Sequence, residues 1–181
     1  EYWQQEADYS IDVRLDEPAR RLIASQTVTY KNNSPDTLRY LWLQLDQNRF
    51  REDSIAEMTR TFSAKPAGSV NLRDAVTPQI SLNSLRRMQA QADKEYGYNI
   101  TRVADGRGNA LSNTIVVTLM RIDLPSPLAP GRSTTVQIDW DYNLLDTKAM
   151  GGRAGYEHFP DDAREGGNDI FLVAQWFPRM V

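Results

Sequence analysis

The sequence predicts a mostly β, antiparallel fold, either two layers as in a β-sandwich or one large curved sheet, that carries a partly helical insertion. Three observations support this class. Apolar and polar residues alternate with a period of two in several segments, which is typical of strands with one solvent-facing side. Short runs rich in Pro, Gly, Asn and Asp separate these segments. From Asp46 to Lys94 the pattern changes, and apolar residues become sparse.

The first quarter of the chain contains three expected strands. Alternation runs from Tyr9 to Leu15 and from Leu22 to Tyr30, and a turn that includes Pro18 lies between the two segments. The segment from Leu38 to Leu45 has apolar residues on both faces, which predicts burial on both sides. Because short turns join the three segments, we expect an antiparallel meander.

Residues 46–98 are expected to form a long insertion between strands. Ser54 is placed to cap a short helix that runs through Arg60, with Glu57 at the capping-box position. Residues 81–92 also have helical spacing of their apolar side chains. The competing interpretation of the whole stretch is a solvated loop.

The second half returns to strand patterns and brings the expected total to about seven strands. A Gly-containing turn at 105–109 has hairpin chemistry, and a region that includes two pairs of glycines is expected to be loop. The expected strands are 96–103, 113–124, 134–142 and 170–174, and the expected loop is 144–168.

Composition excludes several classes of protein. The 181 residues include 21 Lys and Arg against 24 Asp and Glu, a net charge of −3, which argues against a nucleic-acid partner. No apolar run approaches the roughly 20 residues of a membrane-spanning helix. Without cysteine there is no disulfide scaffold, no thiolate zinc site and no cysteine nucleophile.

The search for catalytic chemistry predicts no catalytic residue and no metal site in this chain. His158 is the single histidine, whereas a catalytic zinc normally takes three protein ligands, commonly two or three of them histidine. The G-x-S-x-G motif that presents a nucleophilic serine is also missing. We therefore interpret His158 as a surface loop histidine.

Five segments carry a resemblance to a known family through their order and spacing. They are YSIDVRLD at 9–16, ASQTVTYKNN at 24–33, LRYLWLQL at 38–45, LAPGRSTTVQID at 128–139 and FLVAQWFPR at 171–179. Together they resemble the N-terminal domain of aminopeptidase N-type zinc metallopeptidases, the gluzincin family that includes leukotriene hydrolase. The form of the last segment looks like a bacterial branch. The resemblance covers nearly the whole chain apart from the insertion at 46–98.

The resemblance implies that residues 1–181 are a single, non-catalytic N-terminal β domain with a saddle-shaped, mostly antiparallel sheet, truncated before its last strands. In this family such a domain packs on a thermolysin-like catalytic domain that follows in the same polypeptide. That second domain carries H-E-x-x-H, binds one zinc ion and takes a peptide substrate. The zinc would then be bound outside this chain.

The resemblance also points to two substrate-binding residues. Family members carry T-Q-x-E on a strand end that faces the catalytic cleft, and the matching residues here are Ala174 to Phe177. Gln175 matches the glutamine, and Phe177 replaces the acid. This replacement shifts the implied role of Gln175 and Phe177 toward shaping the first specificity pocket. Gln175 would supply an amide to it and Phe177 an apolar wall. The alternative is that Gln175 satisfies backbone groups at a strand end.

Two other functions and the compartment stay open. The chain is alternatively a stand-alone β-sandwich interaction module, or a carbohydrate-binding module that uses its tryptophan and tyrosine side chains. It opens at Glu1 and ends inside an apolar run, so we expect a processed chain whose fold continues beyond Val181. Together with the lack of cysteine, this suggests a periplasmic or secreted protein, with a cytoplasmic origin still open.

Overall fold

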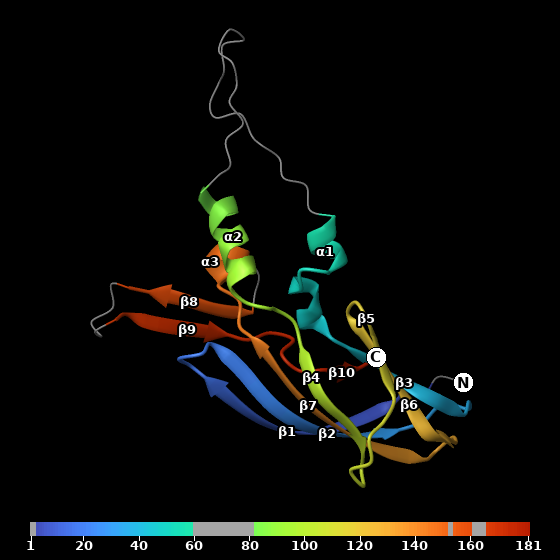
Figure 1. Ribbon diagram of the computed structural model, residues 1–181. Helices are drawn as coiled ribbons and strands as arrows, with labels where there is room; N and C mark the ends of the chain where they lie inside the picture. Colours follow the sequence, from blue (N-terminus) through green and yellow to red (C-terminus); the bar gives the residue numbers. More distant parts are fainter. Residues whose placement is uncertain (1–2, 60–81, 152–153, 161–165) are drawn as a thin grey trace.

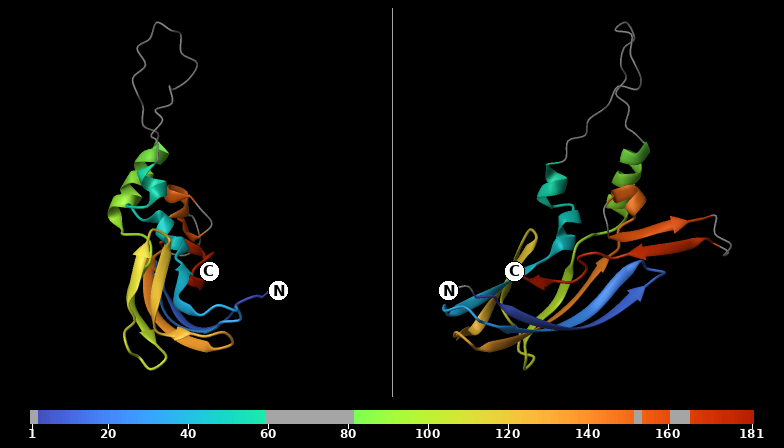
Figure 2. Two further views of the ribbon diagram at one scale, coloured as in Figure 1. Left: turned by 90° about the vertical axis from the view of Figure 1, so that its right-hand side faces the viewer. Right: turned by 180° about the vertical axis from the view of Figure 1, so that it is seen from behind.

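The computed structural model confirms the mostly β, antiparallel class (Figure 1). Two four-stranded sheets enclose one hydrophobic core in a sandwich-like arrangement, and a two-stranded sheet lies beside them. Helices gather on one side of the molecule, away from the convex face of the larger curved sheet (Figure 2). The structure describes residues 3–59, 82–151, 154–160 and 166–181.

The first large sheet has the strand order β1-β2-β7-β4, with every neighbouring pair antiparallel. The period-two pattern explains its central strands, because alternate side chains of β2 and β7 are buried and those between them are not. The expected strands at the two ends of this sheet are also present. The bounds are β1 Glu6–Asp16, β2 Arg21–Lys31, β7 Ser133–Asn143 and β4 Asn99–Asp105.

The second large sheet has the order β10-β3-β6-β5, and it shows that the expected meander is wrong. After β2 the chain crosses to this sheet, where β3 pairs with β6 instead of β2. Buried Asn32 explains the crossing, because its side-chain amide donates to the carbonyl oxygens of Asp36 and Leu128. The bounds are β10 Arg179–Met180, β3 Leu38–Gln44, β6 Leu119–Leu128 and β5 Asn113–Val116.

Two further details of the second sheet correct the expectations. The single strand expected at 113–124 is two strands, because Val117 adopts a left-handed φ of 53° that turns the chain between β5 and β6. The outer face of β3 is not buried: Tyr40 is 42% exposed, and the Arg121 guanidinium covers its ring at 4.3 Å. On this face of β3 the Tyr40 ring is therefore covered by the Arg121 side chain and not by a second layer of strands or helices.

The insertion contains the helices that the sequence predicts. Ser54 caps the first, since its side-chain oxygen accepts from the backbone N–H of Glu57. The predicted end at Arg60 lies outside the described residues, as do residues 61–81 of the stretch for which a solvated loop is the competing interpretation. Among the described helices, none is long and apolar enough to cross a membrane. The bounds are η1 Asp46–Phe50, α1 Ile55–Met58 and α2 Leu82–Asp93.

The region 144–168 is more ordered than the expected loop. It contains helix α3, Thr147–Met150, and strand β8, Gly155–Phe159, which pairs with β9, Asn168–Leu172. The described part of the chain thus holds ten strands. A five-residue strand held mainly by backbone pairing has little side-chain periodicity, which is why its pattern was weak.

The core lies between the two large sheets. Its fully buried apolar side chains come from β2, β3, β6 and β7, including Val28, Leu43, Met120 and Val136. Trp140 is 1% exposed, and its ring packs edge-to-face against Tyr98 at 5.5 Å. This shared core makes the sheets one unit, and it fixes the position of the segment after β9.

Candidate functional site

The segment between β9 and β10 forms a bend that carries both predicted substrate-binding residues. Gln175 adopts a left-handed φ of 50°, which is unusual for a residue with a side chain. Its carbonyl oxygen accepts from the side-chain amide of Gln47 at 3.2 Å and from the Tyr98 hydroxyl at 3.3 Å. The Gln47 amide also donates to the carbonyl of Ala174 at 3.2 Å. Three hydrogen bonds from side chains to main-chain oxygens, two at Gln175 and one at Ala174, thus hold the strained bend in place.

A buried glutamine ties the end of the same bend to the core. The Gln26 side-chain amide donates to the carbonyl of Pro178 at 2.9 Å, and its oxygen accepts from the Trp140 indole at 3.1 Å. Gln26 is 1% exposed, so both bonds are shielded from water. The bend is therefore anchored from below by β2 and from the side by η1.

Gln175 lies at the wall of a pocket with a volume of about 370 Å³. Its lining residues come from the bend, η1, α1, α2, α3 and the residues next to them. Its lining combines polar groups with apolar ones such as Phe50 and Met150. A volume and a mixed lining of this kind are typical of small-molecule and peptide-terminus sites.

Charged side chains surround this pocket, and most of them are paired. Glu57 and Arg87 form an ion pair of 2.8 Å, and the Arg87 guanidinium also donates to the Met150 carbonyl. Asp46 pairs with Arg179 at 3.1 Å. Arg49, by contrast, is exposed. It makes no ion pair among the described residues, and the Phe50 ring lies 5.3 Å from its guanidinium carbon.

Phe177 has a different environment from Gln175, although only Trp176 lies between them in the chain. Its ring packs edge-to-face on Tyr9 at 5.3 Å and on Trp176 at 5.1 Å, against the hydrophobic core. Phe177 is not among the described residues that line the pocket. The structure therefore places Gln175 at the pocket and Phe177 at the base of the bend.

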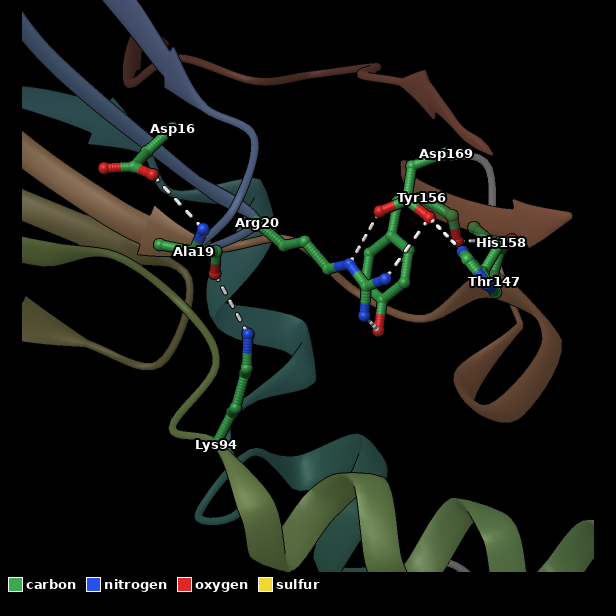
Figure 3. Close-up of polar contacts among 8 residues, drawn as sticks. All are labelled: Asp16, Ala19, Arg20, Lys94, Thr147, Tyr156, His158 and Asp169. Carbon is green, nitrogen blue, oxygen red and sulfur yellow. Dashed lines mark hydrogen bonds and ion pairs between the residues drawn. The ribbon is translucent and has the colours of Figure 1, made fainter. Parts of the chain in front are cut away.

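A second polar cluster joins the β8–β9 hairpin to the β1–β2 turn (Figure 3). The Arg20 guanidinium donates to both carboxylate oxygens of Asp169, at 2.8 and 3.2 Å. It also donates to the Tyr156 hydroxyl at 3.2 Å and lies 4.1 Å from the centre of that ring. His158 Nδ1 lies 2.6 Å from a carboxylate oxygen of Asp169. His158 belongs to strand β8, so the expected surface-loop position is wrong.

The charges of this cluster favour a structural role over a catalytic one. We call the Arg20–Asp169 pair a clamp, because it joins the β8–β9 hairpin to the β1–β2 turn. Burial opposes ionisation of Asp169, but hydrogen bonds from Arg20 and His158 outweigh it and keep the pKa of Asp169 below its ordinary value. An aspartate that orients a histidine is one half of a hydrolytic triad. Among the described residues, no serine or threonine hydroxyl bonds to the His158 ring to complete it. The cluster fixes the hairpin on the sheet.

A catalytic zinc does not fit the residues that the structure describes. Across residues 3–59, 82–151, 154–160 and 166–181, no three histidine or carboxylate side chains come together in a way that could hold a metal ion. His158 faces an aspartate that an arginine already neutralises. We derive no metal chemistry from this part of the chain.

Sequence reasoning missed the residues that build the pocket around Gln175. Gln47, Arg49 and Tyr98 fall at the two ends of the insertion, and Arg87 falls on its second helix. None belongs to a motif. Gln47, Arg87 and Tyr98 act through contacts with segments about 60 to 130 residues away in the chain, and Arg49 makes no ion pair among the described residues. A signal was present only in part: the helical spacing at 81–92 indicated that the insertion has structure of its own.

Comparisons with known proteins add no relative to this picture. No protein-family model matches the chain, and no curated protein matches it. The functional assignment therefore depends on the geometry of the bend, the pocket and their charges.

Proposed function

We propose that this chain is the non-catalytic N-terminal β domain of a zinc-dependent, aminopeptidase-like metallopeptidase. In this proposal it packs against a catalytic domain and helps to shape the pocket for the N-terminal residue of a peptide. The zinc ion and the general base that activate water belong to that other domain. A periplasmic or secreted location accompanies this proposal.

The position of Gln175 is the single observation that carries the proposal. The motif that resembles the family's substrate-contacting strand end lies on a strained bend at the wall of a pocket. Gln175 is exposed, and in the described part of the chain its side-chain amide makes no hydrogen bond. A free amide can both donate to and accept from a peptide terminus. Strain held in place by several bonds is common at binding sites.

An assay of the isolated chain tests whether the catalytic groups and the zinc ion belong to another domain. The 181-residue chain is expected to hydrolyse no aminoacyl p-nitroanilide and to bind no stoichiometric zinc in equilibrium dialysis. Turnover by the purified chain that a chelator abolishes would contradict the proposal, because the reactive groups would then lie within it.

The coding sequence offers a second, independent test. We expect the codons that follow Val181 to encode H-E-x-x-H within roughly one or two domain lengths. A stop codon directly after Val181 would instead favour a stand-alone interaction module. A carbohydrate platform would have to use another tryptophan such as Trp3, which is 48% exposed, because Trp140 is buried and Trp176 packs against the core.

A further inference from the structure

The pocket beside Gln175 contains one positive charge that the described residues do not balance. Among the residues that the structure describes, four charged side chains line it: Asp46, Arg49, Glu57 and Arg87. The two carboxylates are each neutralised, one by Arg87 and the other by Arg179 from β10. Arg49 lines the pocket, is exposed, and has no ion-pair partner among the described residues. A ligand that enters this space meets a net positive field.

From this imbalance we infer that the pocket accepts a peptide whose first residue has a carboxylate side chain, with Arg49 as its charge partner. The inference rests on the proposed function, since it names the substrate class of the same site. Arg49 would determine specificity without taking part in bond cleavage. A guanidinium suits this role because its planar set of donors matches a carboxylate.

The other arginine of the pocket is not available for this role. Arg87 is committed on two sides, to the carboxylate of Glu57 and to the main-chain oxygen of Met150. Both members of this ion pair are at most 20% exposed, so breaking it for a ligand would leave a carboxylate poorly solvated. Arg87 therefore supports the wall, and Arg49 is the arginine free to meet an anion.

The remaining lining favours a small organic anion over an inorganic one. Phe50, Ala56, Met150 and Ala154 contribute apolar surface, which inorganic phosphate cannot use. Gln175, which carries an amide, also lines this pocket. An acidic side chain attached to a peptide backbone combines a carboxylate, a few methylene groups and backbone polar groups, and it suits all three kinds of surface.

This inference also assigns a task to the insertion at 46–98. Its η1 carries Arg49 and the Gln47 amide that holds the bend, and its α1 and α2 supply the Glu57–Arg87 pair. The insertion thus builds the wall and the charge of the pocket, whereas the β sheets carry Gln175. The part of the chain that departs from the family resemblance would set which peptides are accepted.

Isothermal titration calorimetry with two nearly isosteric tripeptides tests the inference on the full 181-residue chain. Glu-Ala-Ala and Gln-Ala-Ala differ by one charge and almost nothing in shape. At low ionic strength we expect Glu-Ala-Ala to bind about tenfold more tightly, a modest ratio because Arg49 is exposed. R49Q should remove the preference, whereas R132Q, which deletes an equal charge on an exposed turn, should retain it.

Each outcome has a definite reading. Equal affinity of the wild-type chain for both peptides, an unchanged preference in R49Q, or phosphate binding as tight as that of Glu-Ala-Ala would overturn the inference. Circular dichroism of R49Q checks that the variant folds, which its exposed position leads us to expect.

A further variant separates failure of this inference from failure of the proposed function. Gln175→Gly removes the side chain at a left-handed φ that glycine adopts without strain. If both peptides bind equally and this variant weakens both, the acidic preference is wrong and the peptide pocket stands. If neither peptide binds the wild-type chain, both the inference and the peptide-binding role fail.

Discussion

The side-chain amide nitrogen of Gln47 lies 3.2 Å from the main-chain oxygen of Gln175. These residues are 128 positions apart, and one belongs to the insertion while the other follows the last long strand pair. Gln47 is buried, so the bond is not exchanged readily for one to water. The left-handed bend that presents Gln175 is therefore supported by the insertion.

Replacing Gln47 should weaken this support. Gln47→Leu keeps the size of the side chain but removes both bonds to the bend, and we expect a loss of about 1–2 kcal/mol in the free energy of unfolding. Urea denaturation measures it. The matched control is Gln89→Leu on the exposed side of α2, which should change stability by less than about 0.5 kcal/mol. Equal effects of the two variants would refute a specific role for Gln47.

Gln26 offers a sharper test of the anchored bend. Gln26→Leu would leave the Trp140 indole N–H and the Pro178 carbonyl without their partner in a dry core. Each unsatisfied buried group costs about 1–3 kcal/mol, so we expect a loss of at least about 2 kcal/mol by thermal or urea unfolding. Trp140→Phe combined with Gln26→Leu should cost less than the sum of the single changes. Strict additivity would show that the two side chains do not act together.

The Arg20–Asp169 clamp should make the free energy of unfolding decrease as the pH falls into the acid range. The pKa of Asp169 is lowered in the folded chain, since bonds from Arg20 and His158 outweigh the opposing effect of burial. A depressed folded pKa contributes stability above the unfolded pKa of about 3.9, and this contribution is lost as the pH falls through the folded value. Unfolding free energies measured from about pH 6 to pH 2.5 should show the decline.

Two variants identify the source of that decline. Asp169→Asn should be less stable at neutral pH. It should also reduce the decline of the unfolding free energy in acid, here called the acid limb, because asparagine has no charge to lose. Asp8→Asn, at an exposed site in β1 where no side-chain contact is found among the described residues, should leave the limb unchanged. A limb that persists in Asp169→Asn would assign the acid sensitivity to other carboxylates.

Gly155 occupies a position that no other residue fits. An added Cβ would lie 2.2 Å from the carbonyl oxygen of Leu145, so the backbone itself would have to move. We expect Gly155→Ala to cost about 2–5 kcal/mol, from overpacking and backbone strain together. Gly131→Ala meets nothing within 4 Å but also has a positive φ, so it should cost only about 1–2 kcal/mol. Differential scanning calorimetry of both proteins compares them, and equal losses would exclude the steric term.

The sequence predicted the strands well and their partners poorly. The alternation of Val136, Ile138, Trp140 and Tyr142 identified the buried face of β7, because one strand's pattern reports its own burial. It says nothing of which strand lies alongside. The meander failed for this reason, since buried Asn32 sends the chain to the other sheet.

The candidate site could be predicted only where a motif existed. Gln175 came from the resemblance of a continuous segment to a family pattern, and the structure places it at a pocket. Gln47 and Arg87 belong to no such pattern, because their roles arise from contacts across the fold, and Arg49 lies at the pocket only because the fold brings its short helix there. Long-range pairing of single side chains leaves little trace in the order of residues.

The β8–β9 hairpin pairs with neither large sheet through a continuous ladder, and its link to the β1–β2 turn is made by side chains around Arg20. We therefore expect its amide protons to exchange through a local opening that is separate from the cooperative unfolding of the sandwich. In deuterated water the hairpin should lose its protons first, with β2 and β7 retaining theirs longest. The chain thus contains a region that can open while the framework that holds Gln175 stays closed.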